Sequence, residues 1–218
     1  MTLWGNGNII YVKTKKEERH MSITIIKQKV EEAEKILINN NNAHWGYTEY
    51  EKEVYSQVSY DDLGFNVKFT IKEKNPLREK TNHFEFVHED SCVEFFANFD
   101  PENSDRYINF ETNANGVMNV SFRANRYDAT PLKLEEVEGF EIKADIFDDY
   151  WTVSYKIEFS FLKKYYPNFD IDKAEYISCN FYKCGEKTEI EHYMSCFEVK
   201  TEKPDFHRPE YFGRIYLK

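Results

Sequence analysis

The chain has 218 residues, 17% of them aromatic, and a formal net charge of -10 at pH 7. This charge repels nucleic-acid phosphates and anionic membranes, so we expect neither nucleic acid nor a membrane as a partner. The first twenty residues lack the apolar run of a secretory signal, and no stretch approaches the roughly 18 apolar residues of a membrane span. These features predict a cytoplasmic location.

Residues 1–21 have the character of an N-terminal extension, because the segment 13–20 is charged and aperiodic. The segment that follows begins like a strand and then places Val30, Ala33, Ile36 and Leu37 at helical spacing before a run of asparagines. This spacing predicts a short helix. No linker follows residue 45, so we expect one domain over residues 22–218.

Beyond residue 45 the apolar residues recur with a period of two, which is typical of strands. The clearest alternation is Trp151, Val153, Tyr155, Ile157 and Phe159, whose side chains we expect to point inward together. About ten such segments, separated by turn residues, predict an all-β, antiparallel β-sandwich of the jelly-roll or immunoglobulin-like kind. The expected strands are 54–60, 63–71, 92–99, 107–113, 117–123, 140–146, 151–159, 176–183, 191–198 and 213–217.

The chain contains four cysteines, Cys92, Cys179, Cys184 and Cys196. Their spacings of C-x4-C and C-x11-C match no common zinc pattern. Without an export signal, free buried thiols are favoured over disulfides.

Two expected strands carry unusual rows of polar and aromatic side chains on one face. One row is Tyr107, Asn109, Glu111 and Asn113, and the other is Tyr176, Ser178, Asn180 and Tyr182. Such rows combine flat rings with planar hydrogen-bonding groups, which suit the C–H faces and vicinal hydroxyls of a sugar. A solvated outer sheet face explains them equally well.

Two further kinds of chemistry are open. Glu94 and Glu111 lie on neighbouring expected strands and could act as the two carboxyl groups of a glycoside hydrolase. His88, Cys184, His192 and His207 could form a metal cage, although nothing fixes their spacing.

Four segments in order resemble the family 9 carbohydrate-binding modules and their stand-alone relatives. They are "HEDSCVEFF" (88–96), "YINFETNANG" (107–116), "NFYKCGEKTEIEHYMS" (180–195) and "PDFHRPEYFG" (204–213). The resemblance spans roughly residues 22–218. It implies a non-catalytic β-sandwich that binds cellulose, xylan or short sugars, often in polysaccharide catabolism beside glycoside hydrolases. It also implies that calcium could be a cofactor, with ligands that the sequence does not place.

Residue by residue, the resemblance makes Glu94 a sugar hydrogen-bonder. It places Glu111 where the family uses an Arg, Tyr182 where it uses an amide, and Phe206 at one of two tryptophans that sandwich the sugar. Val87 and His88 stand where the other tryptophan belongs, so one wall of the aromatic clamp is missing or rebuilt.

The expected ligand is therefore a soluble saccharide or glycoconjugate, bound at a concave face. Its predicted carbohydrate-binding residues are Glu94, Glu111, Asn113, Asn180, Tyr182, Lys183, Phe206, His207 and Arg208. Two alternatives stay open at this point. Phe206 and Phe212 could be core plugs that close the sandwich, or the fold could carry haem on a Met/His pair, as some wider fold relatives do.

Overall fold

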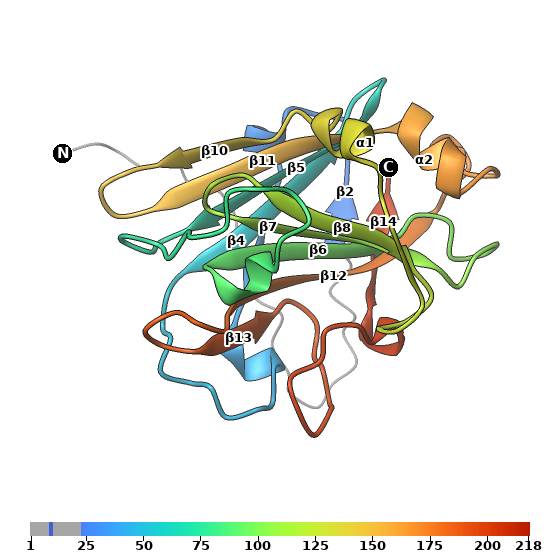
Figure 1. The fold of residues 1–218 in the computed structure, drawn as a ribbon. Coiled ribbons are helices and arrows are strands. Elements are labelled where there is room, and N and C mark those ends of the chain that lie inside the picture. The colour runs from blue at the N-terminus through green and yellow to red at the C-terminus, as the bar shows by residue number, and fades with distance from the viewer. Residues whose placement is uncertain (1–8, 11–22) are drawn as a thin grey trace.

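A computed structural model describes residues 9–10 and 23–218 of the chain. Within these residues two β-sheets pack face to face, and the helices are short (Figure 1). The predicted β-sandwich is confirmed. The predicted extension, residues 1–21, lies outside the described residues except for Ile9–Ile10. No helix in the described part of the chain is long and apolar enough to cross a membrane.

The first sheet has six strands in the order β1-β3-β4-β5-β11-β10. Its central strands β5 and β11 are antiparallel, with Ile71 opposite Trp151 and Phe65 opposite Ile157. This register aligns their apolar rows on the same face. The bounds are β1 (Ile9–Ile10), β3 (Lys35–Ile38), β4 (Val54–Tyr60), β5 (Gly64–Ile71), β11 (Trp151–Glu158) and β10 (Lys143–Ile146).

The second sheet has eight strands, in the order β2-β14-β12-β6-β7-β8-β9, with β13 also paired to β12. Most neighbours are antiparallel, as predicted, but β2 pairs with β14 and β1 with β3 in parallel. The bounds are β2 (Ile23–Ile25), β14 (Gly213–Leu217), β12 (Tyr176–Gly185), β6 (Cys92–Asn98), β7 (Tyr107–Asn113), β8 (Met118–Arg123), β9 (Ala129–Pro131) and β13 (His192–Ser195).

The helix predicted around Val30 to Leu37 is wrong. A 3-10 turn, η1 (Val30–Glu32), leads instead into β3, where Ile36 and Ile38 are buried and pair against β4. A helix this short is marginal by itself, so strand pairing overrides the local spacing. The other helical elements are η2 (Asn40–Asn42), η3 (Val87–Glu89), α1 (Leu134–Glu138), α2 (Phe159–Tyr165) and η4 (Pro209–Tyr211).

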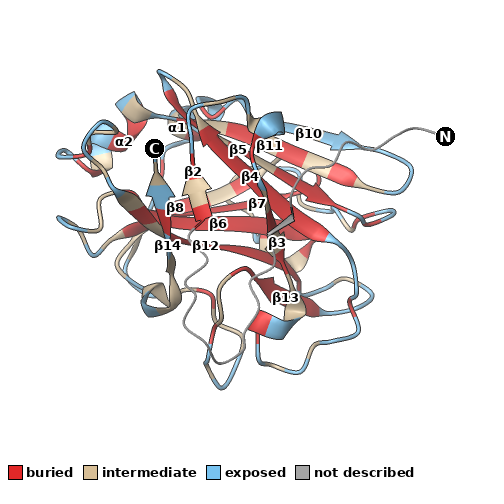
Figure 2. Ribbon diagram, turned by 180° about the vertical axis from the view of Figure 1, so that it is seen from behind, coloured by how far each residue is buried: buried red, intermediate tan, exposed pale blue. Residues whose placement is uncertain are grey.

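The main core fills the space between the two sheets, and the buried stretches of the central strands mark it in Figure 2. Phe95 and Phe181 stack there with ring centroids 4.8 Å apart. The inward row of β11 is confirmed from Trp151 to Ile157. Phe159 departs from it, because it begins α2 and is only partly buried against the core.

We expect Ile157→Ala to lower the free energy of unfolding by about 2–5 kcal/mol. Ile157 has no exposed surface, so the change removes buried apolar area and leaves a cavity. Denaturant unfolding measures the loss. Glu158→Ala, an exposed change at the end of the same strand, is the matched control. Equal unfolding midpoints for the two variants would contradict the inward register of β11.

Candidate functional site

A second apolar cluster lies on the outer face of the eight-stranded sheet, covered by loops rather than by the other sheet. In Figure 1 the blue segment after η2 and the red segment before β14 lie below β12, beside β13. Asn42 Nδ2 donates to Cys196 O (2.5 Å) and ties these two segments together. The buried members are Ala43, Val87, Cys92, Phe96, Tyr107, Tyr182, Cys184, Tyr193, Val199 and Phe206.

An open pocket lies in this loop-covered face, with an empty volume of about 460 Å³ that includes the part open to solvent. The strands β6, β7, β12 and β13 supply its floor, and η3, the loop after β8 and the segment before η4 supply its walls. The lining residues are His88, Glu94, Glu111, Arg126, Cys184, Glu186, Tyr193, Pro204, Asp205, Phe206 and His207.

Strand register brings the two central carboxyl groups together. Glu94 on β6 lies directly opposite Glu111 on β7, and Asn119 on β8 lies opposite Glu111. Glu111 accepts hydrogen bonds from Asn109 Nδ2 (2.8 Å) and Asn119 Nδ2 (2.9 Å), and Glu94 accepts one from Cys184 Sγ (3.1 Å). The amides hold the Glu111 carboxyl group in one orientation.

Both carboxyl groups are 3% exposed, and burial raises the pKa of each above its usual range. Cys184 and the neighbouring carboxyl of Glu111 raise the pKa of Glu94 further. For Glu111, the hydrogen bond from Asn119 and the charge of His88 oppose part of the increase. A raised pKa favours the protonated carboxyl, which can both donate to and accept from a hydroxyl group.

His207 closes one side of the pocket. Its Nδ1 lies 3.0 Å from the Tyr107 hydroxyl, and its Nε2 lies 3.9 Å from Glu111 Oε1. Burial, followed by the charges of Arg123 and Arg126, lowers the pKa of His207 to about 3. The ring is therefore neutral at neutral pH. The tautomer of the neutral ring sets which way the hydrogen bond between Nδ1 and the Tyr107 hydroxyl runs.

Phe206 supplies the apolar wall of the pocket. Its ring stacks on Tyr182 with centroids 4.0 Å apart and an interplanar angle of 13°. Trp45 and Tyr193 contact it from the side, at 5.4 and 6.1 Å between centroids. Phe206 is 8% exposed, and Tyr182 beneath it has no exposed surface. Tyr182 therefore supports the ring that lines the pocket, so Phe206 is both packed and accessible.

Two predicted residues, Asn113 and Asn180, lie on the same sheet face but away from the pocket lining, with their amides engaged in the fold. Asn113 Nδ2 donates to Asp90 Oδ2 (2.8 Å) and Lys80 O (2.9 Å). Asn180 Oδ1 accepts from the backbone N–H of Phe197 (3.0 Å). These bonds anchor the loops that surround the pocket.

Lys183 and Arg208 are also outside the pocket lining. Lys183 lies on the opposite face of β12 from Tyr182 and is fully buried, with Nζ 2.6 Å from His192 Nε2. Arg208 is partly exposed and pairs with Glu210, at 2.6 Å between its NH2 nitrogen and Oε1. The predicted residues that the structure brings together at the pocket are Glu94, Glu111, Phe206 and His207, with Tyr182 behind them.

The metal cage considered from the sequence does not assemble as a unit. Cys184, His88 and His207 line the pocket, whereas His192 lies with Lys183 on the other side of β12. His88 pairs instead with acidic neighbours, at 4.0 Å from Glu111 and 3.7 Å from Glu186. The His88 ring thus stands at the edge of the pocket where the resemblance placed a tryptophan.

Five lining residues were not among the candidates named from the sequence: Arg126, Glu186, Tyr193, Pro204 and Asp205. Tyr193 pairs with Cys184 across the β12–β13 hairpin, which the alternation of residues 191–198 could have suggested. Arg126 and Asp205 lie 79 positions apart in the chain and form an ion pair of 3.0 Å. No local pattern signals such a contact.

We expect the free energy of unfolding to fall less steeply with decreasing pH in His207→Gln than in the wild type. The pKa of His207 is about 3 in the folded protein and about 6.5 when unfolded. Between these values the unfolded state binds a proton that the folded state does not, so stability decreases as the pH falls. The difference in slope is at most about 1.4 kcal/mol per pH unit. Denaturant titrations between about pH 4 and 6.5 measure it, and equal slopes would contradict the neutral, buried imidazole.

A family model, described as carbohydrate-binding family 9, matches residues 23–217. The match covers most of the chain, so this protein belongs to carbohydrate-binding family 9, as the four sequence segments indicated. Among curated proteins, none matches the chain at a significant level.

Solved structures share the fold at low sequence identity. A candidate carbohydrate-binding protein from Bacteroides uniformis ATCC 8492 is 22% identical with a TM-score of 0.73, and the match covers 91% of this chain and 98% of that one. A family 9 module from Caldicellulosiruptor kristjanssonii in complex with glucose is 13% identical, with a TM-score of 0.62 and coverage of 90% and 95%. A family 9 module from Caldicellulosiruptor kristjanssonii in complex with cellotriose is also 13% identical, with a TM-score of 0.61. That match covers 90% of this chain and 93% of the module.

Proposed function

We propose that the chain binds a short saccharide, without catalysis, in the pocket between Phe206 and the Glu94–Glu111 pair. The observation that carries this proposal is the convergence of the Phe206 and Tyr193 rings with several hydrogen-bonding side chains at one open pocket in a member of this family. A pyranose offers an apolar C–H face and a rim of hydroxyl groups, and this pocket provides a surface for each.

The polar side chains of the pocket can both donate hydrogen bonds to the hydroxyl groups of a sugar and accept hydrogen bonds from them. Glu186 and Asp205 accept, Arg126 donates, the neutral imidazole of His207 has one donor and one acceptor nitrogen, and the raised pKa of Glu94 lets its carboxyl do either. The pocket lining includes the aromatic rings of Phe206 and Tyr193, together with the imidazole rings of His88 and His207. This geometry favours a chain end or a short oligosaccharide over the surface of a crystalline polymer.

Gluco-configured sugars are the first ligands to test, because similar modules hold glucose and cellotriose. The family resemblance adds xylan fragments as a second group. We propose cello-oligosaccharides as the better ligands, since similar modules hold glucose and cellotriose. In both groups of sugars the equatorial hydroxyls lie around the ring edge and leave both ring faces apolar for stacking on an aromatic ring.

Two alternative functions have weaker support. Glu94 and Glu111 rise side by side from the pocket floor, and both are buried, whereas a glycoside hydrolase places its carboxyl groups on either side of the scissile bond. For haem, the two methionines in residues 23–218 are Met118 and Met194. Both belong to the core between the sheets, away from the pocket histidines.

We assign no calcium ligands among the described residues. Calcium takes about six to eight oxygen ligands. Among the described residues, the cluster of metal-ligating side chains that lie within reach of one another contains two thiols, which are poor calcium ligands. We therefore propose saccharide binding by the side chains alone.

Calorimetric titration with glucose, cellotriose and xylotriose tests the function. Glu186→Ala should weaken binding roughly tenfold, about 1.4 kcal/mol, through a lost hydrogen bond. Glu189→Ala, an equally exposed change on the same turn but outside the pocket lining, should leave binding unchanged. A reducing-end assay on the same sugars should detect no products. Absence of binding, or equal losses in the two variants, would contradict the proposal.

A further inference from the structure

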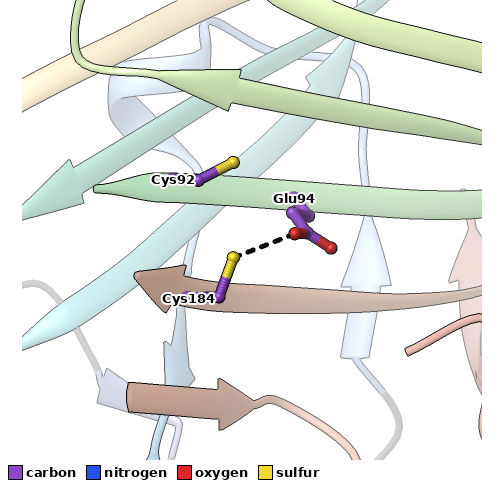
Figure 3. A group of neighbouring side chains, drawn as sticks. All are labelled: Cys92, Glu94 and Cys184. Carbon is purple, nitrogen blue, oxygen red and sulfur yellow. Dashed lines mark hydrogen bonds between the residues drawn. The ribbon is translucent and has the colours of Figure 1, made fainter. Parts of the chain in front are cut away.

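Two thiols and a carboxyl group converge beneath the sugar pocket, a feature that saccharide binding does not require. Cys92 on β6 lies directly opposite Cys184 on β12, and Glu94 lies two residues along β6 on the same face. Figure 3 shows the Cys184 side chain on β12 reaching toward Glu94 on β6, with Cys92 beside Glu94 on the same strand. Their ligand atoms all lie within 4.8 Å of one another, and all three residues are buried.

We propose that Cys92, Cys184 and Glu94 form a binding site for a thiophilic divalent cation of the zinc type. Thiolates select soft or borderline metals, and zinc accepts a carboxylate oxygen beside them. This proposal does not rest on saccharide binding, although the two sites share Glu94.

The spacing of the three groups suits tetrahedral coordination. With Zn–S bonds of about 2.3 Å and Zn–O bonds of about 2.1 Å, neighbouring ligand atoms lie roughly 3.5–3.8 Å apart. Cys184 Sγ and Glu94 Oε1 are already 3.1 Å apart, and no pair of ligand atoms exceeds 4.8 Å. Small side-chain rotations on two rigid, paired strands therefore complete the set without moving the backbone.

The pocket provides an entry path and a fourth ligand position. Cys184 and Glu94 line it, whereas Cys92 lies behind them with no exposed surface. A cation entering from the pocket meets the carboxyl group and one thiol first, and the second thiol closes the site from below. The fourth position then faces the pocket, where water or another small ligand completes the coordination, as in zinc sites with three protein ligands.

Binding requires both thiols and the carboxyl group to lose their protons to solvent. Burial raises the pKa of Cys92 to about 11, and the hydrogen bond with Cys92, followed by burial, raises the pKa of Cys184. The apparent affinity should therefore increase with pH, because fewer protons must be displaced. The pH dependence gives a second readout, independent of any effect of the cation on saccharide binding.

Cobalt(II) titration of the fully reduced protein, without sugar, tests the site. The wild type should bind one cobalt ion and develop the sulfur-to-metal charge-transfer band and the visible bands of a tetrahedral thiolate site, which zinc then abolishes. Cys92→Ser and Cys184→Ser should weaken binding by more than about 100-fold, since loss of an outer-shell partner alone costs 10–100-fold. Glu94→Gln should weaken it less.

Cys179→Ala is the matched control, because Cys179 is equally buried on β12 but faces the core between the sheets. This variant should keep the wild-type spectrum. Zinc should also raise the melting temperature of the wild type and of Cys179→Ala, a readout that needs no cluster variant to fold. A wild-type protein without a thiolate band, or a band that survives in both cluster variants, would overturn the proposal.

Discussion

Replacing Phe206 with alanine should lower the free energy of unfolding by about 3–5 kcal/mol and abolish measurable saccharide binding. The stability loss follows from burial, because the ring is 8% exposed and stacks on Tyr182 at 4.0 Å. The binding loss follows from the pocket, where this ring is an aromatic wall. The core-plug and sugar-platform interpretations of Phe206 are therefore compatible, since its ring packs on Tyr182 and also lines the pocket.

Two Phe→Leu variants separate the effect on stability from the effect on saccharide binding. Phe206→Leu keeps most of the apolar volume but removes the flat ring, so it should weaken saccharide binding about tenfold or more while costing less stability than alanine. Phe212→Leu is the control, because Phe212 packs in the same loop-covered cluster against Tyr107, at 5.3 Å, outside the pocket lining. It should leave the affinity unchanged. Equal affinities for the two leucine variants would remove Phe206 from the site.

Replacing Lys183 with methionine should lower the free energy of unfolding by about 3–5 kcal/mol, as expected when a buried charge that stabilises another buried charge, here that of Glu73, is removed. Lys183 Nζ donates to Cys184 O (2.8 Å) and to His192 Nε2 (2.6 Å), and lies 5.0 Å from the centre of the Tyr50 ring. Burial lowers the pKa of Lys183, while the charge of Glu73 supports its protonated form.

The reciprocal effect appears at Glu73. Burial alone would raise its pKa, but the charge of Lys183 and hydrogen bonds from Ser91 and Trp151 hold it below the usual range. The double variant Lys183→Met/Glu73→Gln should therefore recover part of the stability lost in Lys183→Met, because no unpaired charge remains. Lys173→Met, which breaks an exposed ion pair with Asp170, should change stability little. Denaturant unfolding compares all three variants, and a wild-type midpoint in Lys183→Met would contradict the buried pair.

The strands of this fold could be predicted because burial on a sheet imposes a period of two on the sequence. The inward row of Trp151, Val153, Tyr155 and Ile157 is the clearest case. The same rule separates Lys183 from Tyr182, because adjacent residues of a strand point to opposite faces. Lys183 therefore belonged with the core residues from the outset, not with the predicted sugar-binding face.

The pocket could be predicted only in part. Glu94, Glu111, Phe206 and His207 carry the family motifs and meet at the pocket, but their contacts depend on the registers of β12, β6 and β7. The walls depend on loops whose positions are set by distant contacts such as Arg126–Asp205. Asn113 and Asn180 have the chemistry of sugar ligands, yet their amides satisfy loop backbone groups, and only the folded geometry distinguishes the two uses.

The central claim is that a saccharide binds at the pocket on the outer face of the eight-stranded sheet. Heteronuclear NMR of the wild-type protein, titrated with cellotriose, tests it most directly. We expect chemical-shift changes at the backbone amides around His88, Glu94, Glu111, Glu186 and His207, with residues 99–103 and 168–176 around a separate pocket unchanged. Shift changes confined to that separate pocket, or none at saturating sugar, would contradict it.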